Sequence, residues 1–382
     1  MLCAWGSPFK GFFMHKSYKY RIFPSKNQAE LIDKTIGCAR FAWNQCVETF
    51  NSYDKEKNPK PKYSTSKELR QEYDWMNEVS AAAIQQKQND FKEFKNQHFN
   101  KKRKSKVGRP KFKSKHRSKQ TYRLPNQKFK LENGKIRLEK IGWVKHDNHR
   151  DLPENVKLLS VTISKSRSGR YYVSINFEFA DPKPKNSKKF AGIDVGFKQI
   201  AVVNDGKDTW VYDNPNINLE NQEVKKLQRH LARKKKGSNR WIKCKLKLAK
   251  AYEKLRNKRD HCLHEISRDI VDNFGNLCLE TLNIESMKTN IKNVNRKICG
   301  TALSRFMWFL EYKCLELGNK IIKIDKYFPS TQTCHNCGNI QDVPLDKRVY
   351  ECNNCGMSCC RDENSSINIR REGIKTVGVN TA

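Results

Sequence analysis

The spacing of apolar residues predicts a strand and two helical stretches at the start of the chain. Residues 16–24 alternate polar and apolar side chains, which is typical of a half-buried strand. Residues 25–53 place apolar side chains at helical spacing, and Ser25 with Gln28 matches a capping box at the start of that helix. A second helical stretch is expected over residues 65–98.

Short strands are predicted between residues 121 and 180, where apolar runs are separated by turn residues. The pair Asn133-Gly134 is typical of a two-residue hairpin turn. The aromatic residues Tyr18, Tyr20 and Phe23 of the opening strand are interpreted as core residues rather than base-stacking ones. The first half is therefore expected to be a β-module with a helical insert.

Beyond a Lys/Pro-rich linker at residues 181–189, strands and helices mix. Three short apolar runs within residues 190–213 predict neighbouring strands, and one long helical stretch is expected over residues 221–273. Further strands are predicted over 276–280 and 319–325, with helices over 301–318 and from about residue 362. This order predicts a mixed α/β layer fold.

The charge balance points to a polyanionic partner. The 382 residues include 77 Lys+Arg and 40 Asp+Glu, a formal net charge of +37. Such self-repulsion requires a polyanion, and nucleic acid is favoured over ribosome-like packing or an anionic membrane surface. Because 37% of the residues are hydrophobic, a wholly disordered basic tail is excluded. No apolar run approaches the roughly 18 residues of a membrane span, so no membrane partner is expected.

The cysteines indicate a reducing, cytoplasmic compartment. Most of the 14 cysteines are scattered singly among apolar neighbours, where free thiols act as small core residues. The N-terminus also lacks the apolar region and cleavage site of a secretory signal. Residues 1–13 are interpreted as a mis-assigned extension, because the alternating pattern begins just after Met14.

Four cysteines near the C-terminus match a structural zinc site. They form two C-x-x-C pairs, Cys334 with Cys337 and Cys352 with Cys355, and a glycine follows each pair. Four thiolates fill a tetrahedral site and leave no open position, so a catalytic zinc is not expected. Three nearby residues break the spacing and are interpreted as non-ligands: His335, Cys359 and Cys360.

Three separated carboxylates are candidate ligands for a hard cation. Asp194 ends an apolar strand in Gly-Ile-Asp-Val-Gly, Glu280 ends the run Leu-Cys-Leu-Glu, and Asp362 starts the last predicted helix. A cation at a sheet edge offsets the cost of desolvating such acids, and oxygen ligands suit Mg²⁺ or Mn²⁺. A pair of such ions can stabilise both oxygens of an in-line phosphodiester displacement. Each acid taken alone is also explained as a helix cap or a surface charge.

Taken in order, these motifs resemble the TnpB (OrfB) family of insertion-sequence proteins, which is similar to the type V CRISPR effectors. The resemblance rests on GIDVG, LCLETLNIESM, CHNCG with YECNNCG, and RDENSSINI, and on the opening YKYRIFPSKNQAELIDKTIGCARFAWN. It spans essentially residues 14–372. It implies an α+β, multidomain protein: a β-barrel-like, wedge-like N-terminal module followed by an RNase H-like (RuvC) domain with an inserted zinc ribbon.

The resemblance also sets the expected domain boundaries. The β-module would comprise residues 14–30 and 115–182, and the helical recognition insert with its basic loop residues 31–114. The nuclease domain would comprise residues 186–382, with the zinc ribbon at residues 330–358.

Position by position, the resemblance makes Asp194, Glu280 and Asp362 the catalytic ligands of Mg²⁺ or Mn²⁺. It makes the four cysteines zinc ligands. It implies RNA-guided cleavage of target DNA, in which a guide RNA supplies sequence specificity and the protein supplies charge that tracks the backbone. The expected setting is the nucleoid of a prokaryote, with a monomer favoured over a dimer and a companion transposase of the same element as a further partner.

Two positions depart from the family pattern. Cys360 stands where the family usually has an acid, two residues before Asp362. Ser365-Ser366 stands where the family usually has two alanines after the asparagine. Both departures leave the expected ligands in place, but Cys360 changes the polarity beside them.

Two basic stretches are candidate nucleic-acid contacts. Residues 101–120 hold 11 Lys/Arg and no acid, and residues 225–259 hold 16 Lys/Arg and one acid. Solvated faces would explain such runs in an average protein, but here local acids are too few to pair with them. The candidate contacts are Arg103, Lys104, Arg109, Lys111, Lys113, Lys234, Lys235, Lys236, Arg240 and Lys243.

Two other functions stay open. An RNA-guided DNA-binding repressor without cleavage would share every basic feature, although this chain keeps all three carboxylates. A DNA-binding transposase that joins DNA ends is disfavoured, because no motif-embedded tyrosine with paired histidines is recognisable.

Overall fold

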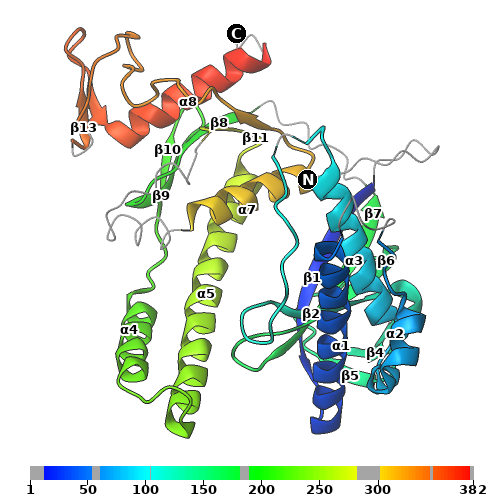
Figure 1. Cartoon of the computed structure of the whole chain (residues 1–382). Coiled ribbons are helices and arrows are strands. Elements are labelled where there is room, and N and C mark those ends of the chain that lie inside the picture. The colour runs from blue at the N-terminus through cyan, green and yellow to red at the C-terminus, as the bar shows by residue number, and fades with distance from the viewer. Residues whose placement is uncertain are drawn as a thin grey trace. The chain divides into compact units, whose positions relative to one another are not determined.

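The computed structural model describes residues 13–53, 61–103, 105–180, 189–281, 302–344 and 347–378 (Figure 1). The chain divides into two compact units, Met1–Ala180 and Asp181–Ala382. Residues 1–12 of the predicted extension and residues 181–188 of the predicted linker lie outside the described residues. No helix among the described residues is both long and apolar enough to cross a membrane.

A seven-stranded antiparallel sheet forms the base of the first unit, in the order β2-β6-β7-β1-β5-β4-β3. The strands are β1 (Phe13–Phe23), β2 (Gln120–Pro125), β3 (Phe129–Glu132), β4 (Lys135–Leu138), β5 (Gly142–His146), β6 (Lys157–Lys165) and β7 (Tyr171–Ala180). Strands β2 and β3 lie at the two ends of this order, so the barrel-like closure stays a prediction.

The alternation of β1 places one set of its side chains in the core. Tyr18, Tyr20 and Ile22 are buried, as the period of a half-buried strand requires. Phe23 ends the strand and is 46% exposed, so its assignment to the core was wrong. The hairpin prediction is confirmed: Asn133 and Gly134 join β3 to β4 with φ of 45° and 71°, the left-handed pair that the tight turn needs.

The helices of the first unit are α1 (Lys26–Asn51), α2 (Ser66–Glu72), α3 (Ala81–Phe99) and the 3₁₀ turns η1 (Asp74–Glu78) and η2 (Asn126–Lys128). The capping box of α1 is confirmed, since Ser25 and Gln28 exchange hydrogen bonds between side chain and backbone.

The single helix predicted over residues 65–98 is wrong, because three helical segments occupy that stretch. A second capping box, formed by Thr65 and Glu68, starts α2. Tyr73 then adopts an extended conformation and ends it. Met76 lies in the 3₁₀ turn and its side chain is fully buried. Packing of this side chain therefore interrupts the helix, although the apolar spacing alone predicts that the helix continues.

The second unit is built on a five-stranded mixed sheet in the order β10-β9-β8-β11-β12. Strands β8, β9 and β10 pair antiparallel, whereas β11 runs parallel to both β8 and β12. The strands are β8 (Phe190–Asp194), β9 (Gln199–Asn204), β10 (Thr209–Asp213), β11 (Asn276–Leu279) and β12 (Ile321–Lys323). A separate two-stranded sheet joins β13 (Val349–Glu351) and β14 (Ser358–Cys360).

In the described part of the second unit, the helices are α4 (Asn218–Ala232), α5 (Asn239–Asn273), α7 (Leu303–Glu316) and α8 (Arg361–Val377). The one helix predicted over residues 221–273 is wrong, because α4 and α5 form a hairpin (Figure 1). Gly237 turns the chain with φ of 89°, and Ser238 accepts a hydrogen bond from the Trp241 N–H to cap α5. The turn at Gly237 and the cap at Ser238 therefore divide into two helices a stretch that the residue pattern alone predicts as one.

Two glycines bring α8 against the sheet. A Cβ added to Gly192 of β8 would lie 2.0 Å from the Ser366 carbonyl oxygen and 2.5 Å from the Arg370 nitrogen of α8. A Cβ on Gly373 of α8 would lie 2.2 Å from the sulfur of Cys278 in β11. The helix therefore packs on β8 and β11 at a distance that no larger residue allows.

Replacing Gly192 by Ala is expected to destabilise the second unit by about 3 kcal/mol, because the new methyl group meets backbone that cannot move aside. Urea unfolding would measure this loss. Gly37→Ala is the matched control, since nothing lies within 4 Å of a Cβ there and alanine favours the surrounding helix. Equal losses in the two variants would contradict the packing argument.

Candidate active site and metal centre

Asp194 and Glu280 meet at the same edge of the sheet because their strands are parallel neighbours. Strand β8 pairs with β11 in a register that places Ile193 opposite Leu279. Asp194 and Glu280 are the next residue on each strand, so both carboxylates stand at the carboxyl ends of adjacent strands. Such strand ends are where side chains converge in mixed sheets.

Asp362 reaches this edge from α8. It lies in the first turn of the helix, directly after β14. The close contact of α8 with Gly192 fixes how that turn lies against the sheet. The electrostatic influence of Asp362 on Asp194 shows that the structure brings these two predicted residues together.

The three acids repel one another in a poorly solvated place. Burial raises the pKa of Asp194 to about 8, and the carboxylates of Glu280 and Asp362 add to the rise. Burial also raises the pKa of Glu280, opposed by a hydrogen bond from the Ser330 hydroxyl. A cation placed among these oxygens would relieve both effects.

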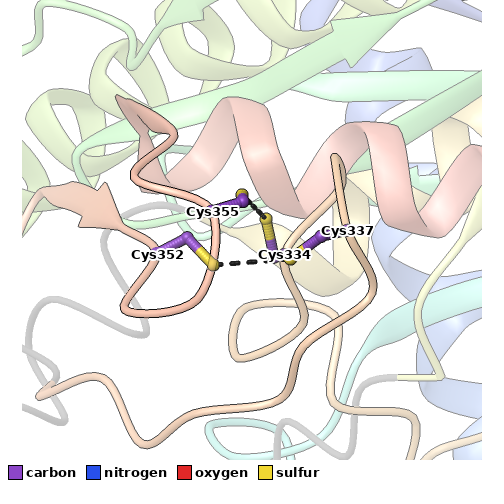
Figure 2. A group of neighbouring side chains, drawn as sticks. All are labelled: Cys334, Cys337, Cys352 and Cys355. Atoms are coloured by element: carbon purple, nitrogen blue, oxygen red, sulfur yellow. Dashed lines mark hydrogen bonds between the residues drawn. The ribbon is translucent and has the colours of Figure 1, made fainter.

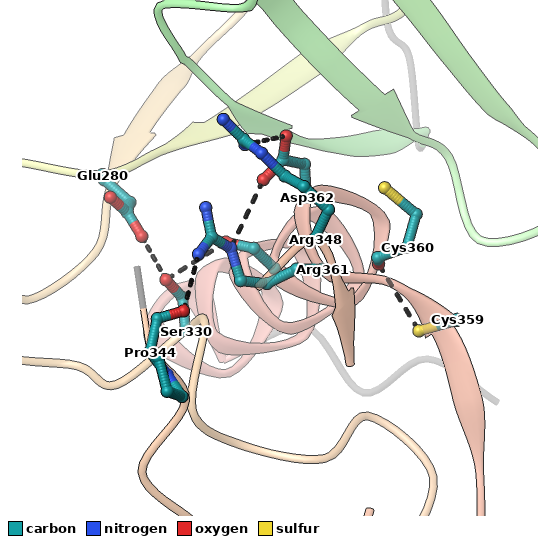
Figure 3. A network of polar contacts seen from close by, with 9 residues as sticks. Glu280, Ser330, Pro344, Arg348, Cys359, Cys360, Arg361 and Asp362 are labelled. Carbon is teal, nitrogen blue, oxygen red and sulfur yellow. Dashed lines mark hydrogen bonds and ion pairs between the residues drawn. The ribbon is translucent and has the colours of Figure 1, made fainter. Parts of the chain in front are cut away.

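Two arginines partly balance the acid charge at Asp362 (Figure 3). An Arg348 Nη1 lies 3.5 Å from Asp362 Oδ2, and Arg361 Nε lies 3.6 Å from Asp362 Oδ1. Arg361 also lowers the pKa of Asp194, although burial and the other two acids outweigh it. Sequence reasoning missed Arg348, because it stands next to β13 and only the fold brings it to the acids.

Buried side-chain amides on α8 bind the cysteine segment (residues 330–358) to the helix. Asn364 donates to the Thr333 carbonyl at 2.8 Å, and Asn368 donates to the carbonyls of Ser330 and Thr333 at 2.9 and 2.6 Å. Ser365 donates to the Ser330 hydroxyl at 3.2 Å, and Ser330 in turn contacts Glu280 (Figure 3). The run Asp-Glu-Asn-Ser-Ser-Ile-Asn therefore links the cysteine segment to the acids, a role that its polarity alone does not reveal.

The four predicted cysteines converge in one cluster (Figure 2). Their sulfur atoms all lie within 4.8 Å of one another, with 3.7 Å between Cys334 and Cys355 and 3.6 Å between Cys337 and Cys352. Among the described residues they are the one such group of potential metal ligands, so the three carboxylates are spread more widely. This spacing fits four sulfurs around a zinc ion.

Each C-x-x-C pair forms the expected knuckle. Gly338 donates its N–H to the Cys334 carbonyl at 2.9 Å, and Gly356 donates to the Cys352 carbonyl at 3.0 Å, with positive φ at both glycines. The Asn339 backbone N–H, together with the Asn354 side chain and the neighbouring cysteines, lowers the pKa of Cys337 to about 6, which favours the thiolate that a metal requires.

The three residues interpreted as non-ligands lie outside the sulfur cluster. His335 faces α8, where its backbone N–H donates to Asn364 Oδ1 at 2.9 Å. Cys359 is half-buried, and Cys360 is exposed directly before α8.

The predicted basic contacts fall on two surfaces, one in each unit. In the first, Arg109 and Lys111 are exposed, Arg103 contacts Gln97, and Lys113 is half-buried over Trp43. Lys104 lies outside the described residues. In the second, the tip of the α4–α5 hairpin carries a half-buried Lys234 and exposed Lys235, Lys236, Arg240 and Lys243.

Three family models match the sequence. The OrfB_IS605 model, described as "Probable transposase", matches residues 160–291. "Cas12f1-like, TNB domain" matches residues 304–369, and the helix-turn-helix domain of OrfB_IS605 matches residues 14–57. These matches support a TnpB-type (OrfB) protein.

Curated relatives of this TnpB-type chain match over nearly its whole length. It is 28% identical to "Putative RNA-guided DNA endonuclease" from Streptomyces pristinaespiralis, over 94% of this chain and 89% of that protein. It is 26% identical to "Putative RNA-guided DNA endonuclease InsQ" from Escherichia coli (strain K12), over 94% and 92%.

The fold of the TnpB-type chain is also similar to a solved structure. The "Cryo-EM structure of the Cas12f1-sgRNA-target DNA complex" aligns with a TM-score of 0.51 at 14% identity, covering 94% of this chain and 99% of that one. The mixed α/β multidomain architecture is thus shared.

Replacing Cys352 by Ser is expected to abolish zinc retention and to open the cysteine segment to proteolysis, because a three-thiolate site binds a structural zinc far more weakly. Atomic emission on the purified protein and limited trypsin digestion would measure both effects. Cys359→Ser, outside the cluster, is the matched control and should keep its zinc. Full zinc occupancy in the Cys352 variant would refute the assignment.

Asp194→Asn is expected to stabilise the TnpB-type protein at pH 8 without added divalent cation, by on the order of 2 kcal/mol. Because the folded-state pKa is raised to about 8, the wild-type folded state keeps a proton that the unfolded chain loses above about pH 4. Wild-type stability therefore falls as pH rises through that window, and the advantage of the variant shrinks toward pH 4.

Urea unfolding at both ends of that pH window would test this expectation, with Asp213→Asn at the exposed end of β10 as the control. A variant whose stability relative to wild type does not change with pH would contradict it.

Proposed function

We propose that this protein is an RNA-guided DNA endonuclease of the IS605 type. The single observation that carries the proposal is the convergence of Asp194, Glu280 and Asp362 at one sheet edge, in a chain whose full-length relatives are named as such endonucleases. The net charge of +37 supports a partnership with two nucleic acids, guide RNA and target DNA.

The topology supports an RNase H-like (RuvC) assignment for the second unit. Three antiparallel strands, β10, β9 and β8, continue into the parallel strands β11 and β12. The acids come from the first strand in sequence, from the fourth, and from the last helix, which is the arrangement that the sequence motifs imply.

The donor set fits a divalent cation. Carboxylate oxygens suit Mg²⁺ or Mn²⁺, and the raised pKa of Asp194 reflects its burial and the neighbouring carboxylates of Glu280 and Asp362. Asp194, Glu280 and Asp362 would hold the metal, which when bound would activate water and neutralise charge on the scissile phosphate. Mutual repulsion raises the affinity of the acids for such a cation.

The surrounding residues orient this acid set. Ser330 holds Glu280 through its hydroxyl, and Ser365 holds Ser330 from α8. Arg348 and Arg361 keep the Asp362 carboxylate between them. Because the cysteine segment carries both Ser330 and Arg348, we propose that a zinc-filled cluster keeps the acids aligned as well as stabilising its own fold.

Cleavage of target DNA by the protein purified with its co-purifying RNA would test the proposal. Asp194→Ala is expected to slow cleavage in Mg²⁺ at least about a thousandfold, since a lost metal ligand removes about 4 kcal/mol of transition-state stabilisation. Asp213→Ala at the end of the edge strand β10 should cut at the wild-type rate. Sequencing the co-purifying RNA supplies the guide for the assay.

If Asp194→Ala cuts as fast as wild type, the active-site assignment is wrong. If wild type occupies its target in Mg²⁺ without cutting it, the alternative of a nuclease-silent, RNA-guided repressor replaces the proposal.

A further inference from the structure

Residues 105–119, called the strap from here on, are anchored although they form no helix or strand. His98 of α3 contacts the Val107 carbonyl through Nδ1 at 2.6 Å. The Trp43 indole of α1 donates to the Lys111 carbonyl at 3.1 Å. Gln120 donates to the carbonyls of Lys115 and Ser118 at 2.8 and 3.0 Å, closing the far end.

Asn44 of α1 makes the strongest of these anchors. Its side-chain amide donates to the Lys113 carbonyl at 3.0 Å and accepts from the Lys113 N–H at 2.8 Å. These two bonds imitate the pairing of a neighbouring strand, so they fix the backbone of the strap in both directions.

Lys113 itself turns inward. Its ammonium group lies 3.3 Å from the centroid of the Trp43 ring, in cation–π contact. Burial lowers the pKa of Lys113 to about 8, so this lysine serves the attachment of the strap rather than its outer face.

The outer face of the strap is strongly cationic. Arg109, Lys111, Lys115 and Arg117 are exposed, and none has an ion pair within the described part of the chain. The strap contains no acid. Phe112 stands among these cations and is 58% exposed, which is unusual for a phenylalanine with no packing role.

We propose that the strap is a preformed binding surface for a nucleic-acid strand. Among its exposed cations, Arg109, Lys111, Lys115 and Arg117 contact phosphates, and Phe112 stacks on a base, the combination that single-strand binders use. Trp43 and Asn44 are positioning residues that order the strap before binding, so the partner does not have to supply that ordering free energy. The inference rests on the proposed function only in taking nucleic acid as the partner.

The charged face is tested by Lys111→Gln with Lys115→Gln. Binding of fluorescein-labelled single-stranded DNA, and separately of single-stranded RNA, is measured against salt concentration without Mg²⁺. We expect about tenfold weaker binding and a log–log salt slope reduced by about 2, one for each lost phosphate contact. Lys67→Gln with Lys130→Gln removes the same charge from exposed positions elsewhere in the unit and should change the slope little.

The positioning role is tested by Asn44→Ala, with Asn44→Asp as a variant that keeps the acceptor and loses the donor. Asn44→Ala should speed trypsin cleavage at Lys111, Lys115 and Arg117. It should also weaken binding several-fold while leaving the salt slope unchanged, because the cations remain. Asn44→Asp should lie between wild type and Asn44→Ala in both assays. Phe112→Ala should likewise weaken binding without a change of slope.

The outcomes distinguish whether the strap binds target DNA or guide RNA. A loss confined to the DNA probe assigns the strap to target DNA, and one confined to the RNA probe assigns it to the guide. Wild-type affinity for both probes in the Lys111/Lys115 variant overturns the proposal. Faster proteolysis of Asn44→Ala with unchanged affinity overturns the positioning role. Because no cleavage is measured, a protein that never cuts DNA still gives a result.

Discussion

The close approach of α8 to β8 and β11 is the constraint on which the second unit depends. Gly192 and Gly373 permit it, since a methyl group at either position would overlap atoms of the opposing element. This contact fixes the first turn of α8, and with it Asp362, against the strand ends that carry Asp194 and Glu280. The glycine of the Gly-Ile-Asp motif thus acts through packing, two residues away from the acid that gives the motif its chemistry.

The same helix joins the acid site to the cysteine cluster. Its buried Asn364 and Asn368 amides donate hydrogen bonds to carbonyls of the cysteine segment. The Ser365 hydroxyl donates to Ser330, which in turn donates to Glu280. A zinc-filled cluster, as proposed above, would therefore both stabilise this small, sparsely hydrophobic module and help to orient carboxylates that repel one another. The raised pKa of Asp194 follows first from its burial and then from the neighbouring acids, and the proposed cation site rests in part on it.

Positive charge is arranged by a different rule from the acids. The three acids converge at one sheet edge. The cations are many and lie on two surfaces, the strap in the first unit and the tip of the α4–α5 hairpin in the second. On the strap, order comes from backbone carbonyls and N–H groups bound by Trp43 and Asn44, which leaves the charged ends free. Such a preordered surface can bind a phosphate backbone with a smaller loss of conformational entropy.

Local patterns in the sequence determined most elements, the capping box at Ser25, the Asn133-Gly134 hairpin and the cysteine pairs, because caps, turns and knuckles depend on residues close together in the chain. The sequence also singled out the three acids, through motif resemblance. Tertiary structure alone decided the interruption at Met76 within residues 65–98, the arrival of Arg348 beside Asp362 and the inward turn of Lys113. These features depend on which distant segments pack together. The periodic pattern of apolar and charged residues in one segment does not identify the segment that packs against it.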